Sequence, residues 1–202
     1  LLVSTTGQRN VAVGYTALDA ATTGSDNAVV GAYAGTAVTT GIENTLLGYY
    51  AGAAITTTNY NTAVGSSALQ NNTAANNTAV GRTALYANTT GATNVAVGQA
   101  ALDANTTASN NVAVGANAMT ANTTGTSNVA VGKGSLEANT TADSNTAIGY
   151  LALLANTTGA GNVAVGSNAL DANTTGGSNV AIGLDALGAN TTADSNVAVG
   201  RG

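Results

Sequence analysis

The segment NVAVGQAALDANTTASN, residues 94–110, is followed directly by NVAVGANAMTANTTGTS, residues 111–127, and then by NVAVG again. The repeat has the consensus N-V-A-V-G-x-x-A-L-x-A-N-T-T-G-x-x, in which we call the first Asn position 1. Its period is 17 residues throughout, except for one interval of 16 residues between Asn61 and Asn77. A fixed period of this kind is typical of proteins that stack one structural unit per repeat. The twelve copies start at Asn10, Asn27, Asn44, Asn61, Asn77, Asn94, Asn111, Asn128, Asn145, Asn162, Asn179 and Asn196.

The repeat favours strand over helix. Within NVAVG, β-branched residues alternate with a small one, and Asn and Gly bound the run as turn residues do. The following AALDAN is too short for a stable helix and precedes NTT, which disfavours helix, so we interpret it as a second short strand or an extended arm. Two short strands and two turns predict one coil of a parallel β-solenoid. We therefore expect an all-β fold, a β-roll of twelve 17-residue coils in a single domain, residues 1–202, about 58 Å long at ~4.8 Å per coil.

Position 5 is Gly in every copy. Such recurrence predicts a backbone with positive φ, or a contact too close for a Cβ atom. No GxGxxG or Walker pattern accompanies these residues, so a structural role at a turn is favoured over a phosphate-binding loop. The structural turn glycines are Gly14, Gly31, Gly48, Gly65, Gly81, Gly98, Gly115, Gly132, Gly149, Gly166, Gly183 and Gly200.

The apolar positions suggest a core and an outer surface. Position 4 is always aliphatic, as in Val13 and Ile148, and we expect it to point into the core with the Leu or Met of position 9. Position 3, which is Ala in ten of the twelve copies, would then point outward and pack against another chain. Because three aliphatic side chains per coil offset only part of the entropy lost on ordering it, we expect side-by-side assembly through the Ala surface.

The polar positions form columns. We expect the Asn side chains of position 1 to stack amide on amide between coils. Positions 12 to 14, usually Asn-Thr-Thr, should form a polar stripe, and each such Asn, Asn88 for example, fits the N-x-T glycosylation pattern.

The composition excludes several classes of function. Charged residues make up 6 % of the chain and the net charge is -5, so we expect no nucleic-acid partner. No apolar stretch approaches the roughly 20 residues of a membrane-spanning helix, so we expect no membrane insertion of this segment. His and Cys are absent, which removes a Ser-His-Asp triad and thiolate metal sites. We predict a protein that is not an enzyme, with no catalytic residues, no metal and no cofactor.

Three carboxylates nevertheless recur at position 10 in alternate coils: Asp103, Glu137 and Asp171. Two coils of ~4.8 Å would separate neighbours by ~9.6 Å, close to the pair of an inverting glycosidase. We favour the simpler explanation, in which the spacing lowers repulsion along an exposed column. Calcium-binding turns would require denser acidic ladders.

Tyrosines gather in the first coils. Tyr15, Tyr33, Tyr49, Tyr50 and Tyr60 lie there, against two in the remainder of the chain. Exposed Tyr can stack on sugars or anchor a protein, so these five are the candidate ligand patch. The competing explanation, which we favour, is that Tyr fills core space left by Gly35 and Gly52, which replace the Leu of position 9.

The arrays NVAVGxxALxANTTG and NTAIGYLALLANTTG, the latter at residues 145–159, resemble the head repeats of trimeric autotransporter adhesins, the YadA-like heads. The resemblance covers nearly the whole chain, and similar NTAVG arrays occur in fibre proteins of phages and bacteria. It implies a left-handed parallel β-roll with three chains around one axis. The coils here are longer than is usual in those heads, and the stretch carries no coiled-coil stalk or membrane anchor.

These observations lead to an expected function. We expect a non-catalytic structural or adhesive fibre, or an adhesin-head segment, located outside the cell or on a cell or virion surface. Its partners would be further copies of itself, as a homotrimer or fibre, and a host-surface protein or glycan. Two alternatives stay open: an ice-binding solenoid that uses its Thr columns, and a head-to-tail filament. The latter is suggested because the sequence starts and stops in mid-repeat, as would a segment of a longer array.

Overall fold

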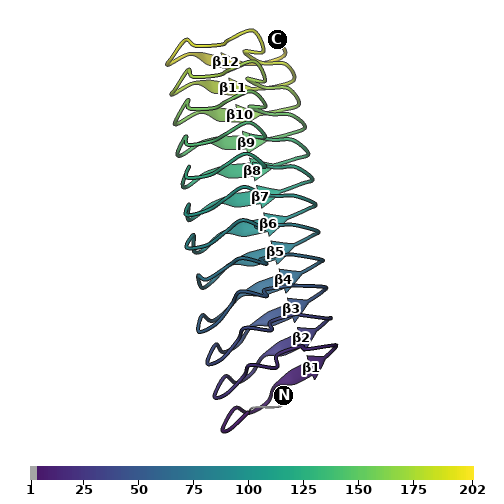
Figure 1. Cartoon of the computed structure of the whole chain (residues 1–202). Helices are drawn as coiled ribbons and strands as arrows, with labels where there is room; N and C mark the ends of the chain where they lie inside the picture. The colour runs from purple at the N-terminus through teal and green to yellow at the C-terminus, as the bar shows by residue number, and fades with distance from the viewer. Residues whose placement is uncertain (1–3) are drawn as a thin grey trace.

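The computed structural model describes residues 4–202, and it contains one parallel β-sheet that runs the length of the solenoid (Figure 1). Each repeat contributes one strand, and each strand pairs with the next in chain order. The predicted parallel β-solenoid with a 17-residue repeat is therefore confirmed. The strands are β1 Val11–Val13, β2 Ala28–Val30, β3 Thr45–Leu47, β4 Thr62–Val64, β5 Thr78–Val80, β6 Val95–Val97, β7 Val112–Val114, β8 Val129–Val131, β9 Thr146–Ile148, β10 Val163–Val165, β11 Val180–Ile182 and β12 Val197–Val199.

Register is constant along the sheet. Every residue lies beside the same repeat position of the next coil, as Val95 lies beside Val112. The short repeat keeps this register too, with Thr62 beside Thr78. The missing residue lies outside the strand: one Thr follows Asn72, where most coils have two Thr after position 12.

The rest of each coil consists of turns, so the predicted second strand is wrong. Positions 7 and 9 adopt left-handed backbone, as at Thr83 (φ 54°) and Leu85 (φ 51°), whereas the residues of a regular strand have negative φ. Hydrogen bonding between coils continues all the same: the Leu85 amide donates to the Ala101 carbonyl at 3.0 Å. The described residues 4–202 include no helix that could span a membrane.

Glycine at position 5 is required by both backbone conformation and space. Gly115 has φ +139°, and a Cβ added there would lie 2.5 Å from the Gly132 carbonyl oxygen of the next coil. Neighbouring coils therefore approach each other backbone to backbone at this corner, where a side chain would force them apart.

The core is the reverse of the sequence prediction. The middle residue of the strand, position 3, points inward and is fully buried from β2 to β11, as in Ala113. Positions 2 and 4 point outward and are half-buried or exposed; Ile148, at position 4, is 41 % exposed. The predicted inward Val and Ile of position 4, and the predicted outward Ala surface, are both wrong.

Ala rather than Val points inward because the interior of each coil is narrow. Each coil is closed by tight turns, and the large side chain of position 9, such as Leu102, fills the space opposite the strand. That leaves room for Ala at positions 3 and 8. In coils 2 and 3 the sizes are exchanged: Gly replaces Leu at position 9, and position 3 is Val29 or Leu46. A Cβ on Gly52 would lie 2.6 Å from Leu46 Cδ2.

Two buried columns of Asn complete the interior. At position 1, the Asn111 amide N–H donates to Asn94 Oδ1 at 3.0 Å, so each Asn holds the backbone of the next coil. At position 12, Asn122 Nδ2 donates to Asn105 Oδ1 at 2.9 Å and to the Gly125 carbonyl at 3.0 Å. The predicted stacking at position 1 is confirmed. The Asn of position 12 lies inside rather than on a surface stripe, because its amide satisfies the carbonyl of position 15.

Candidate functional site

The described residues 4–202 contain no pocket and no cluster of three or more Asp or Glu that could hold a metal ion. The outer surface of this part of the molecule is the remaining candidate for recognition. Two features of that surface differ from the surrounding polar turns: the outward side of the sheet and a group of Tyr rings.

We call the side chains of positions 2 and 4 along β1 to β12 the strand face. All of them are Val, Ile, Leu, Ala or Thr, and none carries charge. Adjacent strands lie ~4.8 Å apart, and positions 2 and 4 of one strand ~6.7 Å apart. Val30 and Ile182 are each 40 % exposed. The result is a long, regular and mostly aliphatic surface of a kind that soluble proteins rarely leave uncovered.

Four Tyr rings pack together beside the first strands. We call Tyr15, Tyr33, Tyr49 and Tyr50 the Tyr cluster. Tyr33 and Tyr50, both at position 7, stack with centroids 4.7 Å apart and planes at 9°. Tyr15 meets Tyr33 edge-on at 5.4 Å, and Tyr49 meets Tyr50 edge-on at 4.6 Å. These rings support one another, since aromatic pairs in such geometries are mutually stabilising.

The cluster is not part of the core. Tyr15 is 69 % exposed and Tyr49 is 53 % exposed. The space left by Gly35 and Gly52 is filled by Leu46, whose methyl groups would touch a Cβ at either position, together with Val38 beside Gly35 and Ile55 beside Gly52. The explanation that Tyr refills the core is therefore wrong. Burial among its neighbours, with smaller contributions from Tyr49 and Tyr33, raises the pKa of the Tyr50 hydroxyl.

The fifth predicted residue lies elsewhere. Tyr60 is at position 17, before the strand rather than after it, and it makes no ring contact with the Tyr cluster. It is 51 % exposed. The structure thus brings together four of the five predicted patch residues.

The recurring carboxylates lie in alternate coils of one column. Asp103, Glu137 and Asp171 occupy one column, and Thr120 and Leu154 lie between them in the intervening coils. Partial burial raises the pKa of the Asp103 carboxyl, while Thr83 and Arg82 act in the opposite direction. One oxygen of Asp103 is buried without a hydrogen-bond partner. No pocket opens beside it in the part of the chain that the structure describes.

The Thr columns differ in availability. At position 13 the hydroxyl donates to the Thr carbonyl of the next coil, as from Thr123 to Thr140 at 3.0 Å. At position 14 Thr124 is exposed, so the arm presents one rank of exposed Thr. The Asn of most Asn-Thr-Thr triplets is buried and hydrogen-bonded, as Asn122 is, and is inaccessible to a glycosyltransferase in the folded coil; Asn190, near the end of the solenoid, is half-buried.

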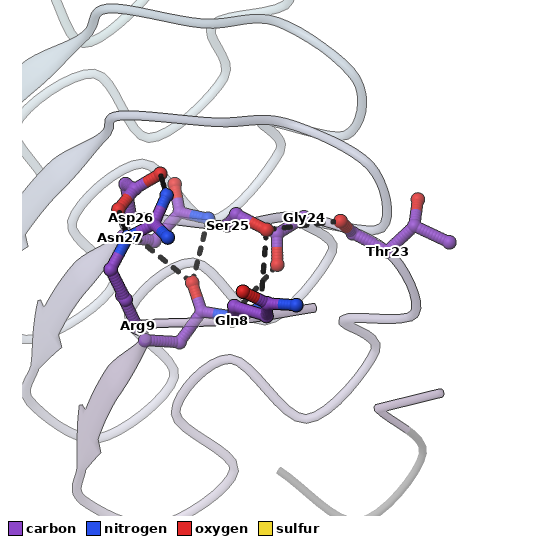
Figure 2. A network of polar contacts seen from close by, with 8 residues as sticks. Gln8, Arg9, Thr23, Gly24, Ser25, Asp26 and Asn27 are labelled. Atoms are coloured by element: carbon purple, nitrogen blue, oxygen red, sulfur yellow. Dashed lines mark hydrogen bonds and ion pairs between the residues drawn. The ribbon is translucent and has the colours of Figure 1, made fainter. Parts of the chain in front are cut away.

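Polar contacts between residues of positions 16 and 17, just before the strand, link one coil to the next (Figure 2). Arg9 Nη2 donates to Asp26 Oδ2 at 2.7 Å, and the Gln8 amide donates to Ser25 Oγ at 3.1 Å. The hydrogen bonding that Arg9 donates to Asp26 lowers the pKa of the Asp26 carboxyl and raises the pKa of the Arg9 guanidinium. This corner is polar and internally paired, which leaves the strand face and the Tyr cluster as the candidate recognition surfaces.

Comparisons of the chain with protein-family models, with curated proteins and with solved structures found no match.

Proposed function

We propose that this chain is a non-catalytic, extracellular rod that assembles side by side with copies of itself and presents a repetitive surface for attachment. The observation that carries the proposal is the strand face. It is mostly aliphatic, with Thr at position 2 only in β3, β4, β5 and β9, and no segment of the described chain covers it.

A second copy of the chain is the best-fitting cover. Both surfaces would have the same ~4.8 Å spacing between strands, so aliphatic side chains could interlock at every coil without loss of register. No charge on either face opposes contact. Burying the exposed part of each Val or Ile contributes on the order of 1 kcal/mol, and the sum over many strands is large.

The number of chains in the assembly is proposed to be three. The support is the resemblance of the repeat to YadA-like adhesin heads, in which three β-rolls surround one axis. Three strand faces turned toward one axis would form a closed, symmetric assembly with the polar arms outside. The Thr column of position 14 and the Tyr cluster would then provide the surface for attachment to a host-surface protein or glycan.

The mass of the assembly tests this proposal. Native mass spectrometry and light scattering of the purified chain at micromolar concentration should give three times the 19.3 kDa of one chain. A single, stable 19.3 kDa species would contradict side-by-side assembly, and a dimer would contradict only the number of chains.

Ice binding is less well supported than adhesion. A flat ice-ordering surface needs more than one rank of free hydroxyl groups, whereas the hydroxyls of position 13 are occupied by hydrogen bonds between coils. Thermal hysteresis in the purified protein would revive this alternative. The head-to-tail filament is tested by electron micrographs, in which it requires fibres much longer than about 58 Å.

A further inference from the structure

We propose that Tyr15 and Tyr49 form a two-ring stacking site for a neutral polysaccharide that runs parallel to the rod axis. The proposal rests on the proposed function, because it assigns a ligand class to the attachment surface. Three properties of the Tyr cluster support it: the orientation of the rings, their spacing and their uncharged surroundings.

Orientation follows from the ring contacts. Tyr33 and Tyr50 occupy the same position in neighbouring coils and stack face to face, so their ring faces are directed mainly along the rod axis. Tyr15 stands at 79° to Tyr33, and Tyr49 at 89° to Tyr50. The faces of Tyr15 and Tyr49 are therefore directed across the axis, as stacking on a chain parallel to the rod requires.

The spacing suits an extended polymer. Both residues are at position 6, two coils apart, with the small side chain of Ala32 between them. At ~4.8 Å per coil their backbones are ~9.6 Å apart, which is comparable to the length of two sugar units in an extended glycan. Alternate sugars could then place their C–H faces on the two rings. Because no pocket is present in residues 4–202, the site suits a polymer that lies along the surface.

The rings are held in place before any ligand binds. The Tyr33 amide donates to the Tyr15 carbonyl at 2.9 Å, and the Ser67 amide donates to the Tyr49 carbonyl at 2.8 Å. Tyr15 packs edge-on against Tyr33, and Tyr49 packs edge-on against Tyr50, and these contacts limit the rotation of the two outer rings. A rigid site loses little conformational entropy when it binds.

The surroundings favour a neutral ligand. Positions 6 and 7 of the first four coils hold Tyr, Ala, Ser and Thr, and the first charged residue in either column is Arg82. An anionic polymer would find no cation to pair with there. A polyproline peptide is the main competitor, since its turn of three residues spans ~9.3 Å. Such peptides dock into aromatic-lined grooves, however, and residues 4–202 contain no pocket.

Affinity electrophoresis in gels that contain hydroxyethylcellulose tests the site, with N-acetylated chitin oligosaccharides as a competing soluble ligand. The chain should be retarded, and Tyr15→Ala or Tyr49→Ala should each weaken binding by about tenfold. Tyr15→Phe and Tyr49→Phe keep the ring and should retain most of the binding. Tyr150→Ala is the matched control: Tyr150 is also at position 6 and 51 % exposed, but positions 6 two coils away hold Ala116 and Leu184.

Four results would overturn the polysaccharide site. The chain binds neither glycan; Tyr150→Ala and Tyr49→Ala weaken binding equally; the chain binds alginate but no neutral glycan; or it binds only decaproline. A change in assembly mass in Tyr49→Ala would place the ring between chains and would also overturn the site. Circular dichroism confirms that each variant folds. If the assembly mass of the wild type stays at three chains while glycan binding is absent, this inference fails and the proposed assembly stands.

Discussion

Leu46 and Gly52 exchange the sizes that the other coils assign to their positions. Most coils pair Ala at position 3 with Leu at position 9, whereas coil 3 places Leu46 in the strand and Gly52 opposite it. A Cβ on Gly52 would lie 2.6 Å from Leu46 Cδ2. The pair shows that these two positions share one volume inside the coil, so a change at one must be compensated at the other.

This shared volume predicts a double-mutant cycle. Leu46→Ala should lower the free energy of unfolding by about 2–5 kcal/mol, because it leaves a cavity beside Gly52. Gly52→Leu alone should also destabilise, through overpacking against Leu46. The double variant restores the usual pair and should regain part of the loss from Leu46→Ala, since the introduced Leu still meets Ile55 Cδ1, 2.9 Å from an added Cβ. Urea unfolding measures all three, and strictly additive effects would show that the two residues do not share a site.

The Gly residues of position 5 predict a loss of stability on substitution that is specific to this position. Gly115→Ala should lower stability by at least about 3 kcal/mol, since alanine must adopt φ +139° and meet the Gly132 carbonyl. Gly161→Ser is the control: Gly161 also has positive φ, but its Cβ would lie 3.7 Å from the nearest atom, and Ser occupies the same position in the next coil. Thermal denaturation should separate the two variants clearly. Similar losses would mean that close approach at position 5 is not what selects glycine.

The buried Asn column of position 12 predicts that removing one side-chain amide causes a large loss of stability. Asn122→Ala removes the donor to Asn105 Oδ1 and the Gly125 carbonyl, and the acceptor of Asn139 Nδ2. Leaving these buried groups without hydrogen-bond partners should lower the free energy of unfolding by about 2–5 kcal/mol. Thr124→Ala, on the exposed column two residues later, should change stability by less than about 0.5 kcal/mol. Equal effects in urea unfolding would argue that the Asn column carries no stability.

Removing the charge of the Asp103 carboxyl is predicted to raise the stability of the fold in a pH-dependent way. Its pKa is raised in the folded chain by burial, so ionisation of this group opposes folding. The penalty is absent below the ordinary pKa of Asp, about 3.9, and grows as the pH rises through the folded pKa. Asp103→Asn should therefore stabilise the protein at pH 7, by less than about 1 kcal/mol because the group is partly exposed, and leave it unchanged at pH 3. Melting temperatures at both values test this, and a loss of stability at pH 7 would contradict it.

The sequence predicted the stack, the register and the glycine corner, because each depends on a pattern that recurs every 17 residues. It misassigned the two sides of the strand. An alternation of period two fits either orientation, and hydrophobicity alone favoured placing Val rather than Ala inside. The turns of positions 6 to 11 were missed because Leu in left-handed backbone, as at Leu102 (φ 53°), is rare in proteins.

A signal for the correct orientation was nevertheless present in the sequence. The two copies with Gly at position 9, Gly35 and Gly52, are also the two with a large residue at position 3, Val29 and Leu46. Compensating sizes at two positions indicate that both face one interior. The same comparison would have separated the Tyr cluster from the core, since Val29 and Leu46, with Val38 and Ile55 at position 12 of the same coils, already account for the missing volume. The surface ring contacts themselves depend on turn geometry that the sequence pattern does not encode.

The most direct test of the account is the assembly mass of a variant with charges on the strand face. Val97→Glu, Val114→Glu and Val131→Glu together place three carboxylates at position 4 of adjacent coils. The control places Glu at Thr107, Thr124 and Thr141 on the exposed column of the same three coils. Light scattering should show that the strand-face variant is a single chain of about 19 kDa with an unchanged circular dichroism spectrum, while the control keeps the mass of the wild-type assembly. An assembled strand-face variant with the same mass as the control would contradict the claim that chains join through this face.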